Sequence, residues 1–260
     1  MASILPVSIG RRVVERMLAS LTVVRRLPPG AGASRLVATP RVGGLKYLFK
    51  PATLWDPELL RIAGLLVRPG GSVWDVGANV GLFSLAARHH AGREGCVVAI
   101  EADLDAALLL FRTARLNEGS FTVLPIAVYG QDGFVRFNIA RRARASNAIE
   151  GFGSSQTGGV LEVRTLPAYR LDSLLEHFTP PTVLKIDVEG AEMDVLRGAV
   201  RTLTEHRPAI YCEVTADTRR AAVAFLEASG YSTFDGDSFD TSSQSSVGDS
   251  TSNLVAIPHD

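Results

Sequence analysis

The sequence predicts an α/β fold in which helices cover both faces of one mostly parallel sheet of about seven strands. Short apolar runs alternate with segments of helical periodicity, over residues 57–124 and again over 182–229. A glycine-rich turn joins one early apolar run directly to a helix pattern. The final apolar run, residues 254–257, follows a long polar loop, which favours an antiparallel last strand.

The composition is that of one large globular domain. The 260 residues are 46% hydrophobic, and 27 basic residues balance 27 acidic ones, so the net charge does not call for a nucleic-acid partner. Cys96 and Cys212 stand alone in apolar runs and are expected to be buried, reduced thiols. No apolar run approaches the ~20 residues that span a bilayer. We therefore expect a cytoplasmic protein.

Residues 1–34 are expected to be a basic amphipathic helix, spanning 1–27, and a linker that starts at Pro28-Pro29-Gly30. Apolar residues recur at near-helical spacing over 9–26, and arginines surround them. Such a helix can cover one end of the domain, act as an organelle presequence or lie on a membrane surface, so peripheral membrane contact through residues 9–26 is an alternative.

Residues 35–260 are expected to form the α/β domain. Its first half begins with a helix over 57–67, with Asp56 as N-cap and Pro57 at its first position. Strands and helices then alternate, as follows: strand 72–76, helix 81–90, strand 96–101, helix 105–117 and strand 121–124. This order predicts parallel strands with right-handed crossovers.

The middle of the chain departs from this alternation. Apolar runs at 127–128 and 134–139 flank an Asp-Gly pair, which predicts a hairpin. Residues 141–159 are rich in Arg, Ser and Gly and predict a long mobile loop, a place where function is often found. A strand at 160–164 and a short helix at 171–178 follow.

Alternation returns in the last third of the chain. The expected elements are strand 182–188, helix 191–203, strand 209–214, helix 218–229 and the two last strands, 231–234 and 254–257. Between these last strands, residues 236–253 are dominated by Ser, Thr, Asp and Gly and are expected to form a second mobile surface loop.

The turn at residues 77–81, Gly-Ala-Asn-Val-Gly, is the first candidate binding site. Gly77 and Gly81 allow a sharp turn and close ligand approach, while Asn79 tolerates left-handed angles. A dinucleotide fingerprint would read G-x-G-x-x-G, so this turn suits a ligand without a pyrophosphate, such as S-adenosylmethionine. Asp75, at the end of the preceding strand, can reach the ammonium group of that ligand or hold the turn.

A second acid follows the next strand. Glu101 lies 26 positions after Asp75, where a carboxylate can accept hydrogen bonds from both ribose hydroxyls of a nucleoside. Asp103 is a second candidate for the same contact. The expected cofactor is therefore S-adenosylmethionine.

The second dense group of charges lies at residues 185–192, Lys-Ile-Asp-Val-Glu-Gly-Ala-Glu. Strand alternation places Asp187 and Glu189 on one face with Lys185, and Glu213 ends the neighbouring strand. These carboxylates are candidates for the base that takes a proton from a hydroxyl acceptor. They can equally bind a divalent cation such as Mg²⁺, or form a salt-bridged strand end. The five histidines show no metal-ligand spacing.

Three sequence segments together resemble the FkbM family of S-adenosylmethionine-dependent methyltransferases. They are V-W-D-V-G-A-N-V-G-L-F at 73–83, V-V-A-I-E at 97–101 and L-K-I-D-V-E-G-A-E at 184–192. The resemblance covers roughly residues 55–257. It implies a Rossmann-like methyltransferase fold, with Asp75, Gly77, Asn79 and Gly81 at the methionine end of the cofactor, Glu101 at its ribose and Asp187, Glu189 and Glu192 in the family's second motif. Alanine follows Glu101 where relatives often have proline.

The resemblance also implies transfer of a methyl group to a hydroxyl of a sugar, glycan or polyketide-like small molecule. A non-catalytic cofactor-binding module is the alternative from another class. A nicotinamide-dependent dehydrogenase is disfavoured, because the chain lacks both G-x-G-x-x-G and a Tyr-x-x-x-Lys pair on a helix. A nucleic-acid methyltransferase is disfavoured by the absence of an N-P-P-Y motif and of a basic face.

Overall fold

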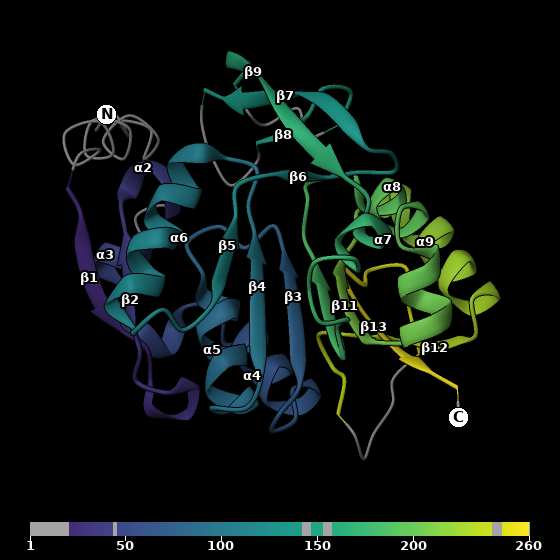
Figure 1. Ribbon diagram of the computed structural model, residues 1–260, viewed down its shortest axis with the longest axis horizontal. Coiled ribbons are helices and arrows are strands. Elements are labelled where there is room, and N and C mark those ends of the chain that lie inside the picture. The colour runs from purple at the N-terminus through teal and green to yellow at the C-terminus, as the bar shows by residue number, and fades with distance from the viewer. Residues whose placement is uncertain (1–20, 44–45, 142–146, 153–157, 241–245, 260) are drawn as a thin grey trace, which may run out of the picture.

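The structure, a computed structural model, describes residues 21–43, 46–141, 147–152, 158–240 and 246–259. Within these residues a seven-stranded sheet forms the centre of the molecule (Figure 1). Its strands lie in the order β12 (Tyr231–Asp235), β13 (Asn253–Pro258), β11 (Ala209–Glu213), β10 (Val183–Ile186), β3 (Ser72–Val76), β4 (Cys96–Ile100) and β5 (Thr122–Leu124). The predicted α/β sheet of seven strands is confirmed.

All neighbouring strands from β11 to β5 are parallel, and β13 is antiparallel to both of its neighbours, β11 and β12. The antiparallel last strand is therefore confirmed, but it is not the edge strand that the sequence suggested. It inserts between β11 and β12, and this insertion places Asn253 opposite Glu213.

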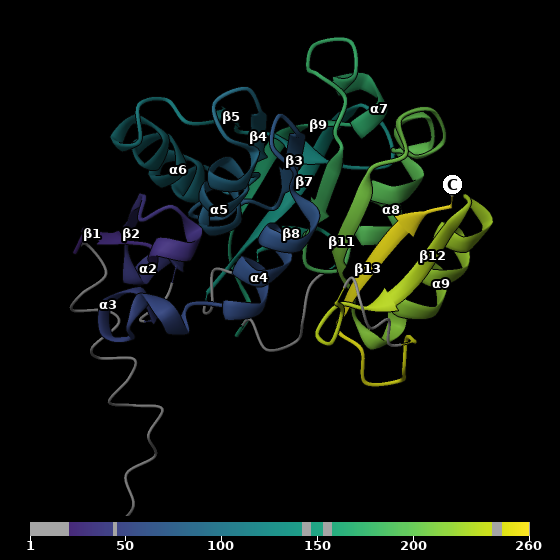
Figure 2. The same cartoon turned by 90° about the horizontal axis from the view of Figure 1, so that it is seen from below.

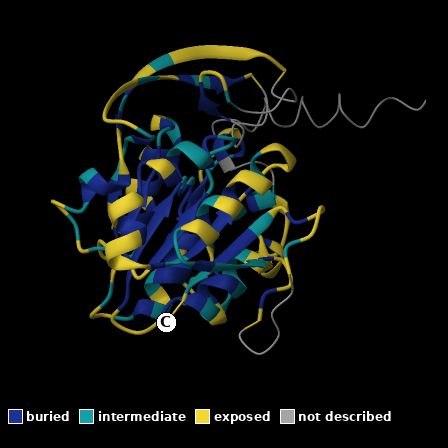
Figure 3. Ribbon diagram, turned by 90° about the vertical axis from the view of Figure 1, so that its right-hand side faces the viewer, coloured by how far each residue is buried: buried dark blue, intermediate teal, exposed yellow. Residues whose placement is uncertain are grey.

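Helices cover both faces of the sheet, and each layer buries its own apolar core (Figure 2). One layer contains α4 (Pro57–Leu66), α5 (Leu82–Ala91) and α6 (Leu104–Leu116). The other contains α7 (Leu171–Leu174), α8 (Glu192–Arg197) and α9 (Ala216–Ala228). Side chains of β3 alternate between the layers, with Val73 in the first core and Trp74 in the second. Figure 3 shows the sheet as buried and the outer helix faces as exposed.

The helix expected over residues 191–203 is shorter. It ends at Gly198, where a Cβ would lie 2.5 Å from the Tyr129 carbonyl oxygen, and a π-helical turn, η5 (Thr202–His206), follows. Cys212 is buried as expected, but the prediction of a buried Cys96 is wrong, because this residue is exposed at the start of β4.

The helix expected over residues 1–27 does not continue to residue 27. Val23–Arg26 form strand β1, which pairs antiparallel with β2 (Arg35–Ala38), and a short turn, η1 (Pro29–Ala31), joins them. Burial alternates along Val23–Arg26, with Val23 and Arg25 half-buried and Val24 and Arg26 exposed, as expected for a strand in which every second residue faces the protein. The rest of the expected helix, residues 1–20, lies outside the described residues.

Between β2 and α4 the chain forms short helical turns, α2 (Pro40–Gly43), α3 (Lys46–Phe49) and η2 (Ala52–Leu54). The Arg25 side chain donates hydrogen bonds to the carbonyl oxygens of Tyr47 and Leu48 and lies 5.2 Å from the centre of the Trp55 ring. The N-terminal segment is therefore attached to the wall of the domain that contains α4.

A small second sheet lies beside the carboxyl ends of the central strands (Figure 1). Its order is β6 (Ala127–Val128), β9 (Val160–Tyr169), β7 (Gly133–Ala140) and β8 (Ala148–Ile149). The predicted hairpin between 127–128 and 134–139 is wrong, because β9 lies between these two strands and pairs with both. Asp132 does not act in a hairpin turn; its carboxylate accepts hydrogen bonds from the Arg170 backbone and the Ser173 hydroxyl.

The two expected mobile loops are partly ordered. In the first, residues 148–149 form β8 and Asn147 is 7% exposed. In the second, Phe239 is 2% exposed, and Arg61 of α4 donates hydrogen bonds to the carbonyl oxygens of Gly236 and Phe239. Residues 142–146, 153–157 and 241–245 lie outside the described part. In the part that the structure describes, no helix is long and apolar enough to cross a membrane.

Candidate functional site

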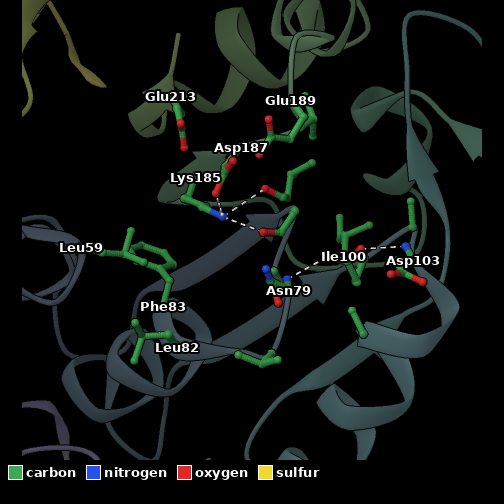
Figure 4. A pocket seen from close by; sticks show the side chains of 18 of the residues that line it. Leu59, Asn79, Leu82, Phe83, Ile100, Asp103, Lys185, Asp187, Glu189 and Glu213 are labelled. Carbon is green, nitrogen blue, oxygen red and sulfur yellow. Dashed lines mark hydrogen bonds and ion pairs between the residues drawn. The ribbon is translucent and has the colours of Figure 1, made fainter. Parts of the chain in front are cut away.

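A cavity of about 540 Å³ opens at the carboxyl ends of β3, β4, β10 and β11. This is the edge at which open parallel sheets bind ligands, and the volume lies within the usual range for small-molecule sites. Figure 4 shows the two groups of polar side chains that face it, one around Asn79 and Asp103 and the other around Asp187, Glu189 and Glu213. Both candidate groups from the sequence therefore line one cavity.

The turn after β3 is fixed by a close backbone contact. Gly77 has a φ of 75°, and a Cβ on this residue would lie 1.8 Å from the Asp187 carbonyl oxygen, so only glycine fits. Asn79 has a φ of 50°, as expected for a residue that tolerates left-handed angles. Its side-chain Oδ1 is buried and has no hydrogen-bond partner among the described residues. Gly77 and Asn79 both line the cavity.

Two residues predicted to contact the cofactor do not line the cavity. Gly81 precedes α5 with a φ of 92°, and its missing Cβ makes room for Leu110. Asp75 is completely buried, accepts a hydrogen bond from the Ser84 hydroxyl at 2.5 Å and lies 3.3 Å from Lys185 Nζ. The structure therefore supports the alternative in which Asp75 holds the turn.

Glu101 is the central polar group of the cofactor end of the cavity. Its Oε2 accepts a hydrogen bond from the Asn79 backbone N–H and its Oε1 accepts one from the Asp103 N–H, each at 2.7 Å. Burial raises the pKa of Glu101 to about 7, and the two backbone hydrogen bonds oppose this rise. Each oxygen keeps a second lone pair, so the carboxylate can still accept two ribose hydroxyls.

Asp103 also lines the cavity, but its carboxylate has structural partners. Oδ1 accepts a hydrogen bond from the Asp105 N–H at the start of α6 and lies 3.3 Å from the Arg164 guanidinium. Oδ2 accepts a hydrogen bond from Asn147 Nδ2 at 2.8 Å. Asp103 therefore joins α6 to the small sheet, and Glu101 is the better-placed ribose ligand.

Lys185, near the carboxyl end of β10, connects the two ends of the cavity. Its side chain is 4% exposed, and Nζ donates a hydrogen bond to the Gly77 carbonyl oxygen at 2.7 Å. The same nitrogen lies 3.1 Å from Asp187 Oδ2 and 3.3 Å from Asp75 Oδ1. Burial alone would lower the pKa of Lys185, but the two carboxylates raise it above its usual value. The ammonium group is therefore retained.

Asp187, Glu189 and Glu213 come together at the other end of the cavity, as the sequence predicts (Figure 4). Burial, and then the charge of Asp187, raise the pKa of Glu213 to about 8. Burial and the neighbouring charges of Asp187 and Glu192 raise the pKa of Glu189 to about 7. Near neutral pH these groups can therefore exchange protons.

Sequence reasoning missed several residues of this end. Tyr211, Asp237 and Asn253 line the cavity beside Glu213, and Asn253 Nδ2 donates a hydrogen bond to Asp237 Oδ1 at 2.7 Å. Strand alternation puts Tyr211 and Glu213 on one face of β11, but only the insertion of β13 brings the other two residues there.

The segment before α4 supplies Lys46, Tyr47 and Asp56 to a further part of the wall, and the first turn of α4 adds Glu58. Asp56 occupies the predicted N-cap position of α4, but its side chain makes no cap hydrogen bond and pairs with Lys46 instead. Pro57 occupies the first turn of α4 as expected.

The cation-binding alternative finds no support in the described residues. No group of three or more His, Cys, Asp or Glu side chains in this part of the chain is arranged to hold a metal ion. The cavity does fit a nucleoside with a cationic substituent, since Glu101 offers free lone pairs, Asn79 offers a buried amide oxygen and the opposite end is rich in carboxylates.

One comparison with known proteins identifies a family. A family model described as "Methyltransferase FkbM domain" matches residues 75–239, which include Glu101, Asp187 and Glu213. This match covers more than half of the chain. A search of curated proteins returned no match.

Several solved structures are similar at low sequence identity. The methyltransferase FkbM from Methylobacillus flagellatus is 15% identical with a TM-score of 0.49, over 76% of this chain and 50% of that one. The precorrin-6y C5,15-methyltransferase from Geobacter metallireducens is 14% identical with a TM-score of 0.49, over 89% and 98%. A SAM-dependent O-methyltransferase from Thermotoga maritima is 13% identical with a TM-score of 0.47, over 91% and 77%. The chain thus spans half the length of the first of these proteins.

Proposed function

The chain belongs to the FkbM family of S-adenosylmethionine-dependent methyltransferases, and from this premise we propose that it methylates a hydroxyl oxygen of a sugar, glycan or polyketide-like small molecule. The observation that carries the proposal is the position of a proton-accepting group. Glu213 has a pKa near 8 and faces the same cavity as the ribose-binding candidate Glu101.

The cofactor end has the residues that S-adenosylmethionine needs. Glu101 accepts the ribose hydroxyls, the turn from Gly77 to Asn79 allows close approach, and Asn79 Oδ1 offers an acceptor to the ammonium group. When bound, S-adenosylmethionine supplies an electrophilic methyl carbon on a positively charged sulfur. The carboxylates at the far end of the cavity favour that positive charge.

The acceptor end has the residues that a polyhydroxylated substrate needs. Tyr211, Asn253 and Asp237 offer hydrogen bonds, and Glu189 and Glu213 can accept a proton when ionised. A hydroxyl is a poor nucleophile, and a base that takes its proton during attack typically accelerates such a step about 10²–10⁴-fold. Carboxyl groups outnumber basic groups among the residues that line the cavity, so we propose a small molecule or a glycan end, and no nucleic acid, as the partner.

The test is a methylation screen in which the formation of S-adenosylhomocysteine is measured with sugars, glycan oligomers and polyketide alcohols. Each acceptor is paired with a deoxy analogue that lacks one hydroxyl. We expect turnover with at least one acceptor, loss of turnover with one deoxy analogue and a new O-methyl signal at that position by NMR. The variant Glu213→Gln should lower turnover by about 10²-fold or more, because it removes the base.

Three results would contradict the proposal. Cofactor binding without turnover of any hydroxylated acceptor favours the non-catalytic binding module. Methylation that survives in every deoxy analogue and appears on nitrogen or carbon excludes O-methyl transfer. A preference for a nicotinamide cofactor would exclude the methyltransferase altogether.

A further inference from the structure

The carboxyl groups of Asp187 and Glu213 form a pair at the ends of two adjacent strands. The register of the parallel strands β10 and β11 pairs Ile186 with Cys212, so Asp187 and Glu213 lie at neighbouring strand ends and line the same cavity. Like charges this close cannot both ionise without cost, so the pair holds one proton more readily than none. What decides the chemistry is which of the two groups keeps that proton.

Lys185 distinguishes the two carboxyl groups. Its buried Nζ lies 3.1 Å from Asp187 Oδ2 and is fixed in place by a hydrogen bond to the Gly77 carbonyl oxygen at 2.7 Å. The Asp187 backbone N–H donates to the Val76 carbonyl oxygen, which fixes the backbone of Asp187 beside the end of β3. No cation forms an ion pair with Glu213 among the described residues.

The other charges around Glu213 favour the same assignment. Asp187 and Glu189 of the neighbouring strand end both disfavour its ionisation, and Lys185 opposes them only weakly. On the β12–β13 side stands Asp237, and on its own strand Tyr211, which is neutral. On the cavity wall formed by the segment before α4 and the first turn of α4, Lys46 pairs with Asp56, and Glu58 pairs with Arg61.

We propose that Lys185 is a positioning residue that holds Asp187 as an anion, so that Glu213 is the group of the pair that releases and takes up the proton. This inference rests on the proposed function, because it assigns the base for the hydroxyl acceptor. Lys185 also ties this assignment to the cofactor turn, since one ammonium group contacts Gly77 and Asp187 together.

In the proposed methyl transfer, Glu213 enters as the carboxylate, and the acceptor hydroxyl donates a hydrogen bond to its Oε. The hydroxyl oxygen lone pair forms the new O–C bond while the S–C bond of S-adenosylmethionine breaks and its electron pair stays on sulfur. The hydroxyl proton moves to Glu213, and the anion of Asp187 accepts the resulting carboxyl hydrogen bond.

The experiment is a pH titration by NMR of the full chain with ¹³C-labelled Asp and Glu carboxyl groups, without cofactor or acceptor. In the wild type we expect Glu213 to titrate with a pKa near 8 while Asp187 stays ionised. Asp187→Asn should lower the pKa of Glu213, because the neighbouring negative charge is gone. Lys185→Met should make Asp187 take up a proton near neutral pH.

Three results would overturn the proposal: Asp187 titrates near neutral pH while Glu213 stays ionised in the wild type, Asp187→Asn leaves the Glu213 titration unchanged, or a folded Lys185→Met leaves both groups unchanged. If Lys185→Met does not fold, Glu213→Gln replaces it, and Asp187 must then stay ionised near neutral pH. The titration needs no turnover, so a failed methylation screen and a failed assignment remain distinguishable.

Discussion

The two ends of the cavity hold buried carboxyl groups for opposite purposes. At the cofactor end, Glu101 is buried but accepts two backbone N–H groups, and Arg164 and Asn147 hold Asp103. At the acceptor end, the carboxyl groups of Glu189 and Glu213 face further carboxyl groups. Burial raises the pKa of the carboxyl groups at both ends. Backbone hydrogen bonds oppose this rise for Glu101, whereas neighbouring charges add to it for Glu189 and Glu213.

In the function proposed above, this difference suits the first end to holding a fixed ligand and the second to exchanging a proton. Preorganised donors keep Glu101 in one geometry, which suits recognition of ribose. Burial, and then repulsion by the neighbouring carboxyl groups, raise the pKa of Glu213 to about 8, close to the neutral pH at which a general base works best. Lys185 joins the two ends, and the close contact of Gly77 with Asp187 fixes their separation.

The largest expected effect comes from breaking that contact. Gly77→Ala places a Cβ against the Asp187 carbonyl oxygen and forces a φ that alanine disfavours. We expect a loss of more than about 3 kcal/mol in the free energy of unfolding, measured by urea denaturation. The matched control is Gly119→Ala, which has a similar φ of 70° but nothing within 4 Å. It should cost only about 1 kcal/mol. Equal losses in the two variants would refute the role of the contact.

A smaller effect is expected when the support of the cofactor end is removed. Asn147→Ala deletes the donor to Asp103 Oδ2 and the acceptor for the Ala140 N–H, both of them buried. The free energy of unfolding should fall by about 1–3 kcal/mol. Arg136→Ala, which removes an exposed ion pair to Glu150 on the same small sheet, should change it by less than about 1 kcal/mol. A larger loss of unfolding free energy in Arg136→Ala than in Asn147→Ala would show that Asn147 is dispensable.

The effect at the acceptor end is a dependence of stability on pH, and it is the smallest within any one pH unit. Because the pKa of Glu213 is raised from 4.5 to about 8, the native state keeps a proton that the unfolded state releases in this window. Its contribution to stability is full below about 4.5 and is lost as the pH rises to about 8. Denaturation of Glu213→Gln across this range should show a stability that falls less steeply than that of the wild type. The difference should stay below about 1.4 kcal/mol per pH unit, the limit for one proton. Parallel curves would mean that Glu213 is not the titrating group.

The sequence predicted those parts of the site that depend on local structure. The strand–turn–helix at 72–91 and the acid after β4 follow from periodicity and turn chemistry, and both are found where they were expected. The meeting of Asp187 with Glu213 follows from parallel neighbouring strands.

What the sequence did not predict depends on pairings between distant segments. The Asp-Gly pair at 132–133 indicated a hairpin, but β9 pairs on both sides of it. Asn253 and Asp237 reached the cavity only because β13 inserted between β11 and β12. Strand alternation placed Lys185 on one face with Asp187, but it did not predict that Lys185 Nζ also contacts Asp75 and the Gly77 carbonyl oxygen.

The most direct test of the two-ended cavity is calorimetric binding of S-adenosylmethionine to the wild type, Glu101→Gln and Glu213→Gln. Glu101→Gln loses the charge and replaces an acceptor with a donor that faces backbone N–H groups, so we expect about 1.5–3 kcal/mol weaker binding. Glu213→Gln should bind the cofactor as the wild type does. No binding by the wild type, or equal losses in both variants, would contradict the account.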